Sequence, residues 1–79
     1  MGEKLSPVKI SIFRKFLEQQ GLKYIRTKGD HEIWSRKDLK RPVIFPIKKK
    51  DIYMRVIVSN LRTLGISTKE FKEQVKKLK

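Results

Sequence analysis

The sequence predicts one small α+β domain over residues 1–79, in which a helix, three antiparallel strands and two further helices follow one another. Apolar residues recur at helical spacing near the start and in the second half of the chain. Between these stretches, β-branched and aromatic residues alternate with polar ones, as in half-buried strands. A chain of 79 residues holds a single core, and neither an internal repeat nor a low-complexity linker divides it.

The first helix is predicted from Ser6 or Ser11 to Gln20, with Pro7 suited to its first turn and Gly21 to its end. The apolar residues of this segment recur every three or four positions: Val8, Ile12, Phe13, Phe16 and Leu17. This spacing gives the helix one apolar face, which we expect to pack on the rest of the core.

Three strands are predicted next, at residues 22–28, residues 31–37 and residues 43–45. The first two are joined through Gly29 and Asp30 and form an antiparallel hairpin. Pro46 ends the third strand or sets it at a sheet edge. Trp34 is assigned to the core, because an aromatic residue on a half-buried strand of so short a chain is more often core than a base-stacking platform.

Two helices complete the predicted order. The second runs from Ile52 to Leu64 and ends at Gly65. Ser67 and Glu70 form a capping-box pattern that opens the third helix. The apolar residues of this last helix share one face, namely Phe71, Val75 and Leu78.

Basic residues far outnumber acidic ones, with 21 Lys and Arg against 8 Asp and Glu and a net charge of +13. Such an excess predicts a polyanionic partner, because phosphate backbones are bound through counterion release. The alternative is a lysine-rich solvated surface of the kind found in some thermophile proteins. Charge alone does not separate DNA from RNA.

The sequence also limits the chemistry and the location of the protein. Without Cys and with a single His, it has neither disulfides nor the ligand set of a zinc site, so we expect no metal and no cofactor. No segment approaches the roughly 20 apolar residues of a membrane span. The start of the chain lacks the apolar stretch of a secretory signal, so we expect a cytoplasmic protein that does not bind membranes.

Several short motifs resemble one known family, the HicA (YcfA-like) mRNA interferase toxins. They are Gln20-Gly21-Leu22, Arg26, Lys28-Gly29-Asp30-His31, Ile33-Trp34, Val43 to Pro46, Lys49-Lys50 and Leu61 to Gly65-Ile66. The resemblance runs from about residue 13 to residue 66 and needs no gaps between these motifs. It implies a fold similar to the double-stranded RNA-binding domain, ribosome-independent cleavage of mRNA, and a HicB-type antitoxin that masks the toxin's active surface.

By this resemblance His31, in the Gly-x-His element, is the catalytic residue. The chemistry of RNA cleavage agrees, because it needs a group that takes a proton from the 2′-hydroxyl or gives one to the leaving 5′-oxygen, and imidazole titrates near neutral pH. The alternative is a surface histidine in a turn, without a role. Asp30 replaces a serine common in the family, and we interpret it as an ordinary turn aspartate rather than as a partner that orients His31.

The candidate RNA-binding residues are Arg26, Lys28, Gly29, Lys48, Lys49 and Lys50. Arg26 and Lys28 alternate on the first strand, so we expect them on one face, where they contact phosphates. Gly29 is expected to adopt a backbone angle closed to other residues. The lysine run resembles the lysines that double-stranded RNA binders place near a helix N-terminus. Generic surface charge and plain turn geometry are the alternatives.

The sequence departs from the family at two points. Many members have a second histidine shortly after the proline, where this chain has Lys48, and many open the second helix with glycine and a hydroxyl residue, where it has Arg55 and Val56. The positive charge leaves two other interpretations open. One is a noncatalytic module that binds double-stranded RNA or other nucleic acid, and the other is a basic domain that docks on an acidic protein.

Overall fold

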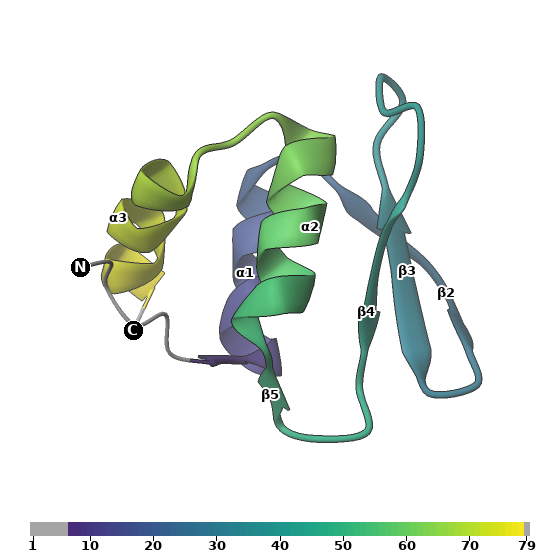
Figure 1. The fold of residues 1–79 in the computed structure, drawn as a ribbon. Coiled ribbons are helices and arrows are strands. Elements are labelled where there is room, and N and C mark those ends of the chain that lie inside the picture. Colours follow the sequence, from purple (N-terminus) through teal and green to yellow (C-terminus); the bar gives the residue numbers. More distant parts are fainter. Residues whose placement is uncertain (1–6, 79) are drawn as a thin grey trace.

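The computed structural model describes residues 7–78 and confirms the predicted α+β fold, similar to the double-stranded RNA-binding domain, with an added C-terminal helix (Figure 1). In chain order, the elements are β1 (Val8–Lys9), α1 (Ile10–Gln19), β2 (Lys23–Lys28), β3 (His31–Ser35), β4 (Val43–Pro46), β5 (Asp51–Ile52), α2 (Met54–Leu64) and α3 (Thr68–Leu78). The strands β2, β3 and β4 form an antiparallel sheet in that order, as the hairpin and the third strand predicted.

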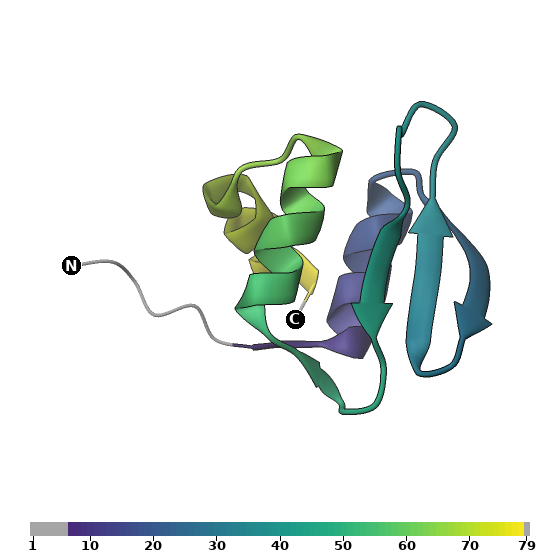
Figure 2. The ribbon, with the colours of Figure 1, turned by 45° about the vertical axis from the view of Figure 1, so that its right-hand side comes forward.

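The helices all lie to one side of this sheet. α1 and α2 pack on one face, and α3 lies beyond them, away from the sheet (Figure 2). The strand residues that point toward the helices are buried, among them Trp34, Val43 and Phe45, and the prediction that Trp34 belongs to the core is confirmed. We call the side of the sheet that faces the helices the covered face. The opposite side, on which no helix of residues 7–78 packs, is the open face.

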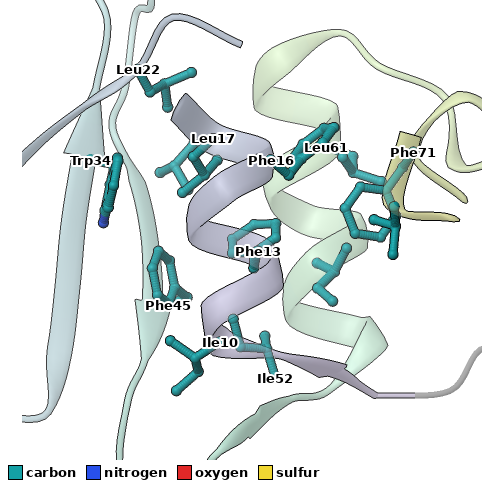
Figure 3. Close-up of a cluster of buried hydrophobic side chains, with 13 residues drawn as sticks. Ile10, Phe13, Phe16, Leu17, Leu22, Trp34, Phe45, Ile52, Leu61 and Phe71 are labelled. Carbon is teal, nitrogen blue, oxygen red and sulfur yellow. The ribbon is translucent and has the colours of Figure 1, made fainter. Parts of the chain in front are cut away.

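The centre of the core is a group of phenylalanine rings contributed by two helices and the sheet. Phe13 of α1 meets Phe45 of β4 edge to face, with ring centroids 5.1 Å apart, and Phe16 meets Phe71 of α3 in the same manner at 4.8 Å. Figure 3 shows α1 between the sheet side chains and those of α3. Burial of each such ring contributes about 1.5–3 kcal/mol, so α3 is part of the core.

The helix ends follow the predicted signals. Gly65 has φ +72°, and the N–H of Ile66 donates to the carbonyl of Leu61 at 3.0 Å, which closes α2 with a left-handed glycine. At the start of α3, the Glu70 N–H donates to the Ser67 hydroxyl at 3.1 Å. The capping residues predicted at Gly65 and Ser67 are therefore confirmed.

Two predictions of element boundaries are corrected by a small second sheet. Val8 and Lys9 pair antiparallel with Ile52 and Asp51, so Ile52, predicted to begin the second helix, lies instead in β5, and α2 begins at Met54. Two-residue strands have no period to read from the sequence. α1 begins at Ile10, close to the predicted start at Ser11, whereas the alternative start at Ser6 lies outside the described residues. Pro7 and Val8, both predicted to belong to this helix, precede it instead, because Val8 pairs with Ile52 in β1.

Candidate active site

His31 is the first residue of β3 and directly follows the turn that joins β2 to β3. It lies opposite Lys28 of β2 and Pro46 of β4. Because side chains alternate along a strand and its neighbour Glu32 is buried on the covered face, His31 lies on the open face, with 49% of its side chain exposed. An imidazole in this position is reachable by a macromolecular substrate.

The turn residues Gly29 and Asp30 fix this position. Gly29 has φ +60°, as expected, and a two-residue connection with positive φ at its first position is typical of a type II′ hairpin turn. The Ile47 N–H donates to the Asp30 carbonyl at 2.7 Å, which ties the turn to the chain just after β4. The turn that presents His31 is therefore held from two sides.

The Asp30 carboxylate contacts the imidazole, with its Oδ1 2.8 Å from Nδ1 of His31. This contact differs from the interpretation of Asp30 as an ordinary turn aspartate. A ring whose Nδ1–H donates to a carboxylate has its tautomer set, and Nε2 is then the nitrogen that accepts or gives a proton. Both side chains are about half exposed, at 49% for His31 and 54% for Asp30, so water competes for this bond.

Lys28 and Arg26 lie on the same face as His31. Lys28 is directly opposite His31, and Arg26 is opposite Ile33. A bulge between Tyr24 and Arg26 shifts the alternation, and it turns Tyr24 to the covered side, where its ring meets Trp34 edge to face at 6.0 Å. The expectation that Arg26 and Lys28 share one face agrees with this register.

The lysine run at residues 48–50 lies in the bend between β4 and β5, and all three lysines are exposed. β5 and Tyr53 separate it from α2, so these lysines do not belong to the first turn of that helix. Lys49 Nζ is 3.1 Å from the Tyr53 hydroxyl, and the Lys50 carbonyl accepts the Ile10 N–H at 2.9 Å. The run and His31 lie at the same end of the sheet (Figure 1).

Glu32 has a role that the sequence-based prediction missed. Its buried carboxylate accepts hydrogen bonds from Trp34 Nε1 at 2.9 Å and from Arg14 Nε at 3.1 Å, and it forms an ion pair with Arg14. Burial raises the pKa of Glu32, but the bonds from Arg14 and Trp34 and the charge of Arg14 outweigh this effect and lower it. The strand alternation that buries Trp34 also predicts a buried Glu32.

Asn60 of α2 is a second buried polar residue that was not singled out. Its Nδ2 donates to the Ile44 carbonyl at 2.9 Å, and its Oδ1 accepts the Ile44 N–H at 3.4 Å. These bonds satisfy the backbone of Ile44 on the side of β4 away from β3, so Asn60 caps this residue at the sheet edge. A polar residue between Ile57 and Leu61, at an apolar helical position, was the signal for it.

Two other features of the described part of the chain bear on its chemistry. Within residues 7–78, no group of three or more His, Cys, Asp and Glu side chains is arranged to hold a metal ion. None of the helices in that range has the length and apolar character needed to cross a bilayer.

Comparison with known proteins identifies the family. Searches of curated proteins and of solved structures gave no significant match. A family model described as the HicA toxin of bacterial toxin–antitoxin systems matches residues 11–66, from α1 to the end of α2, so α3 lies outside the matched region. This match covers more than half of the 79 residues and agrees with the motifs from Gln20 to Ile66. The chain belongs to the HicA toxin family of bacterial toxin–antitoxin systems.

Proposed function

We propose that this protein is an RNA-cleaving toxin, a metal-independent endoribonuclease acting on mRNA in which His31 is the general acid or base. The observation that carries the proposal is the half-exposed imidazole of His31, with a carboxylate on Nδ1 and a lysine directly opposite on the neighbouring strand. Membership of the HicA family supports the choice of RNA over other polyanions.

In the proposed reaction, Nε2 of His31 takes the proton of a ribose 2′-hydroxyl. The 2′-oxygen then attacks the adjacent phosphorus, the bond from phosphorus to the 5′-oxygen breaks, and the leaving oxygen takes a proton from solvent. The products are a 2′,3′-cyclic phosphate and a 5′-hydroxyl. No step needs a metal-bound water.

The transition state of this step carries more negative charge on the phosphoryl oxygens than the substrate does. Cations fixed beside His31 therefore accelerate the step rather than only binding the substrate. Lys28 is directly opposite His31, and Arg26 is on the same face two cross-strand pairs further along. We assign Lys28 to the scissile phosphate, and Arg26, Gly29 and the lysine run at 48–50 to the RNA backbone on either side.

A HicB-type antitoxin is the proposed protein partner. A toxin that cleaves cellular RNA must be inhibited, and a bound protein does so most directly by covering the open face around His31. Because that end of the molecule carries Lys28 and the exposed lysine run, an acidic surface on the partner would be complementary.

The test is cleavage of a defined RNA by the purified full-length wild type, His31→Ala and His31→Gln, with a chelator present and folding checked by circular dichroism. We expect cleavage by the wild type only, with 5′-hydroxyl ends. Ends carrying 5′-phosphate would contradict the mechanism, and equal cleavage by all three proteins would contradict the assignment of His31. RNA binding by all three without cleavage would favour a noncatalytic RNA-binding module.

A further inference from the structure

A second group of basic residues lies at the far end of the sheet from His31. The loop from β3 to β4 and the C-terminal half of α2 enclose an open hollow of about 600 Å³. β3 runs from His31 at one end to Ser35 at the other, so this loop and the His31 turn are at opposite ends of the strand (Figure 1). The polar lining includes Arg36, Lys40, Arg41, Ser59, Arg62 and Thr63.

Arg36 makes one wall of the hollow rigid. Its guanidinium donates to the Gln20 carbonyl at the end of α1 and, through Nε at 2.6 Å, to the Asp38 carboxylate. The Leu39 N–H donates to the Arg36 carbonyl at 3.0 Å, which closes a turn in the loop. The loop is therefore held in place before any ligand binds, which reduces the entropy cost of binding.

The same contacts leave an unbalanced positive charge. Asp38 is the acidic residue of the lining, and its charge is matched by Arg36, whose hydrogen bond lowers the pKa of Asp38 and keeps it ionised. The side chains of Lys40, Arg41 and Arg62 make no hydrogen bond or ion pair with any described residue, and all three residues are exposed. The hollow thus has three cations available for a ligand.

The arrangement on α2 suits oxygen atoms of phosphate groups. Ser59, Arg62 and Thr63 stand at positions i, i+3 and i+4 of the helix, so two hydroxyls and a guanidinium share one face. Hydroxyl and cationic side chains are those that contact phosphates in nucleic-acid complexes. The lining has no aromatic residue, unlike the core of a protein–protein interface, and its openness and charge differ from the enclosed apolar sites of small molecules.

We propose that this hollow is a second RNA-backbone site, in which Lys40, Arg41 and Arg62 bind phosphates remote from the phosphate at His31. The inference rests on the proposed RNA-directed function. Along β3 alone, His31 and Ser35 are about 13 Å apart, so one phosphate cannot contact both sites. The RNA strand extends from one end of the sheet to the other, and its binding energy is shared between the two sites.

The experiment measures binding of an unstructured 2′-O-methyl RNA of 20 nucleotides by the full chain over a range of salt concentrations. Methylation removes the attacking hydroxyl, so the result does not depend on whether His31 is catalytic. The test variant is Lys40→Gln/Arg41→Gln/Arg62→Gln. The matched control is Lys69→Gln/Lys76→Gln/Lys77→Gln on α3, which lowers the net charge by the same three units, from +13 to +10.

Because the test variant removes three phosphate-binding cations, its slope of log K against log salt should fall by about 2, and its affinity at low salt should drop at least about tenfold. In the control variant, the slope of log K against log salt should fall by less than about one. Equal losses of affinity and of slope in both variants would show that only the overall positive charge attracts the RNA, and would overturn the proposal. Binding of polyglutamate that falls only in the test variant, with RNA binding unchanged, would identify a protein-docking site instead.

Nuclear magnetic resonance gives an independent readout on the same samples. Addition of the methylated RNA should shift the amide signals of residues 36–41 and 59–65 as well as those around His31. Shifts confined to the His31 end would contradict a second site. The amide spectra of the free variants also verify that the exposed substitutions leave the fold unchanged.

Discussion

The carboxylate of Asp30 lies 2.8 Å from Nδ1 of His31, although the two residues are neighbours in a tight turn. This pair is formed within the turn itself, because Gly29 supplies the positive φ and the Asp30 carbonyl is fixed by the Ile47 N–H at 2.7 Å. The contact leaves Nε2 as the nitrogen available to a substrate on the open face. We therefore propose that Asp30 is a positioning residue for the imidazole.

Replacing Asp30 by asparagine should lower kcat for RNA cleavage roughly 10- to 100-fold with little change in KM, because ring orientation is lost while the binding lysines remain. ¹⁵N shifts of the two ring nitrogens should show more of the other tautomer in Asp30→Asn than in the wild type. Glu73→Gln is the control, since it removes an equal charge at an exposed position of α3, outside both proposed RNA sites. An unchanged kcat in Asp30→Asn would show that the contact is incidental.

Gly29 is expected to be replaced by neither alanine nor asparagine without a loss of stability. A Cβ at this position meets no atom within 4 Å, so the cost of a side chain comes only from φ +60°, at which an L residue is disfavoured by about 1–2 kcal/mol. The first central position of a type II′ turn is a glycine position. Urea unfolding should therefore show both Gly29→Ala and Gly29→Asn to be less stable than the wild type, and a variant as stable as the wild type would mean that the turn changes type.

Glu32 should stabilise the protein in a pH-dependent way. Its folded-state pKa is lowered, so its contribution is present above the unfolded-state pKa of about 4.3 and is lost as the pH falls through the folded value. Glu32→Ala should cost about 1–3 kcal/mol at pH 7, because the indole N–H of Trp34 loses its buried acceptor. Glu32→Gln keeps an acceptor and should cost less.

Urea titrations of the wild type and Glu32→Gln at several pH values test the sign. The difference in unfolding free energy between the two proteins should shrink as the pH falls below about 4. A difference that grows toward acid pH would contradict an ionised Glu32 in the folded state.

Asn60→Ala should leave the Ile44 carbonyl without its partner and cost about 1–3 kcal/mol. Hydrogen exchange should report the change locally, with faster exchange of the Ile44 amide than in the wild type. Arg55→Ala, on an exposed position of the same helix, is the control. Equal exchange rates for Ile44 in all three proteins would show that Asn60 does not protect this residue at the sheet edge.

Phe71→Ala should destabilise the protein by about 3–5 kcal/mol, because its ring packs on Phe16 and leaves a cavity when removed. A chain ending at Ile66 should be at least as unstable, although it retains the whole family-matched region. Chemical denaturation measures both. A truncated chain as stable as the full one would make α3 an independent appendage.

The sequence by itself determined the kind and order of the main elements, because their signals are local. Periods of 3.6 and 2 residues mark α1, β3 and α2, and the stops at Gly21 and Gly65 need only the conformational freedom of glycine at a helix end. The motif around His31 identified the family for the same reason, since its residues are adjacent in the chain.

Tertiary structure decided what no local pattern contains. The pairing of β1 with β5 joins residues more than forty positions apart and moves Ile52 from the predicted helix into a strand. The bond from Ile47 to Asp30 brings the lysine run to the end of the sheet that holds His31, and the packing of α2 beside β4 makes Asn60 a cap for Ile44. Such contacts depend on how the elements pack in three dimensions, and the periodicity of one segment does not encode the position of another.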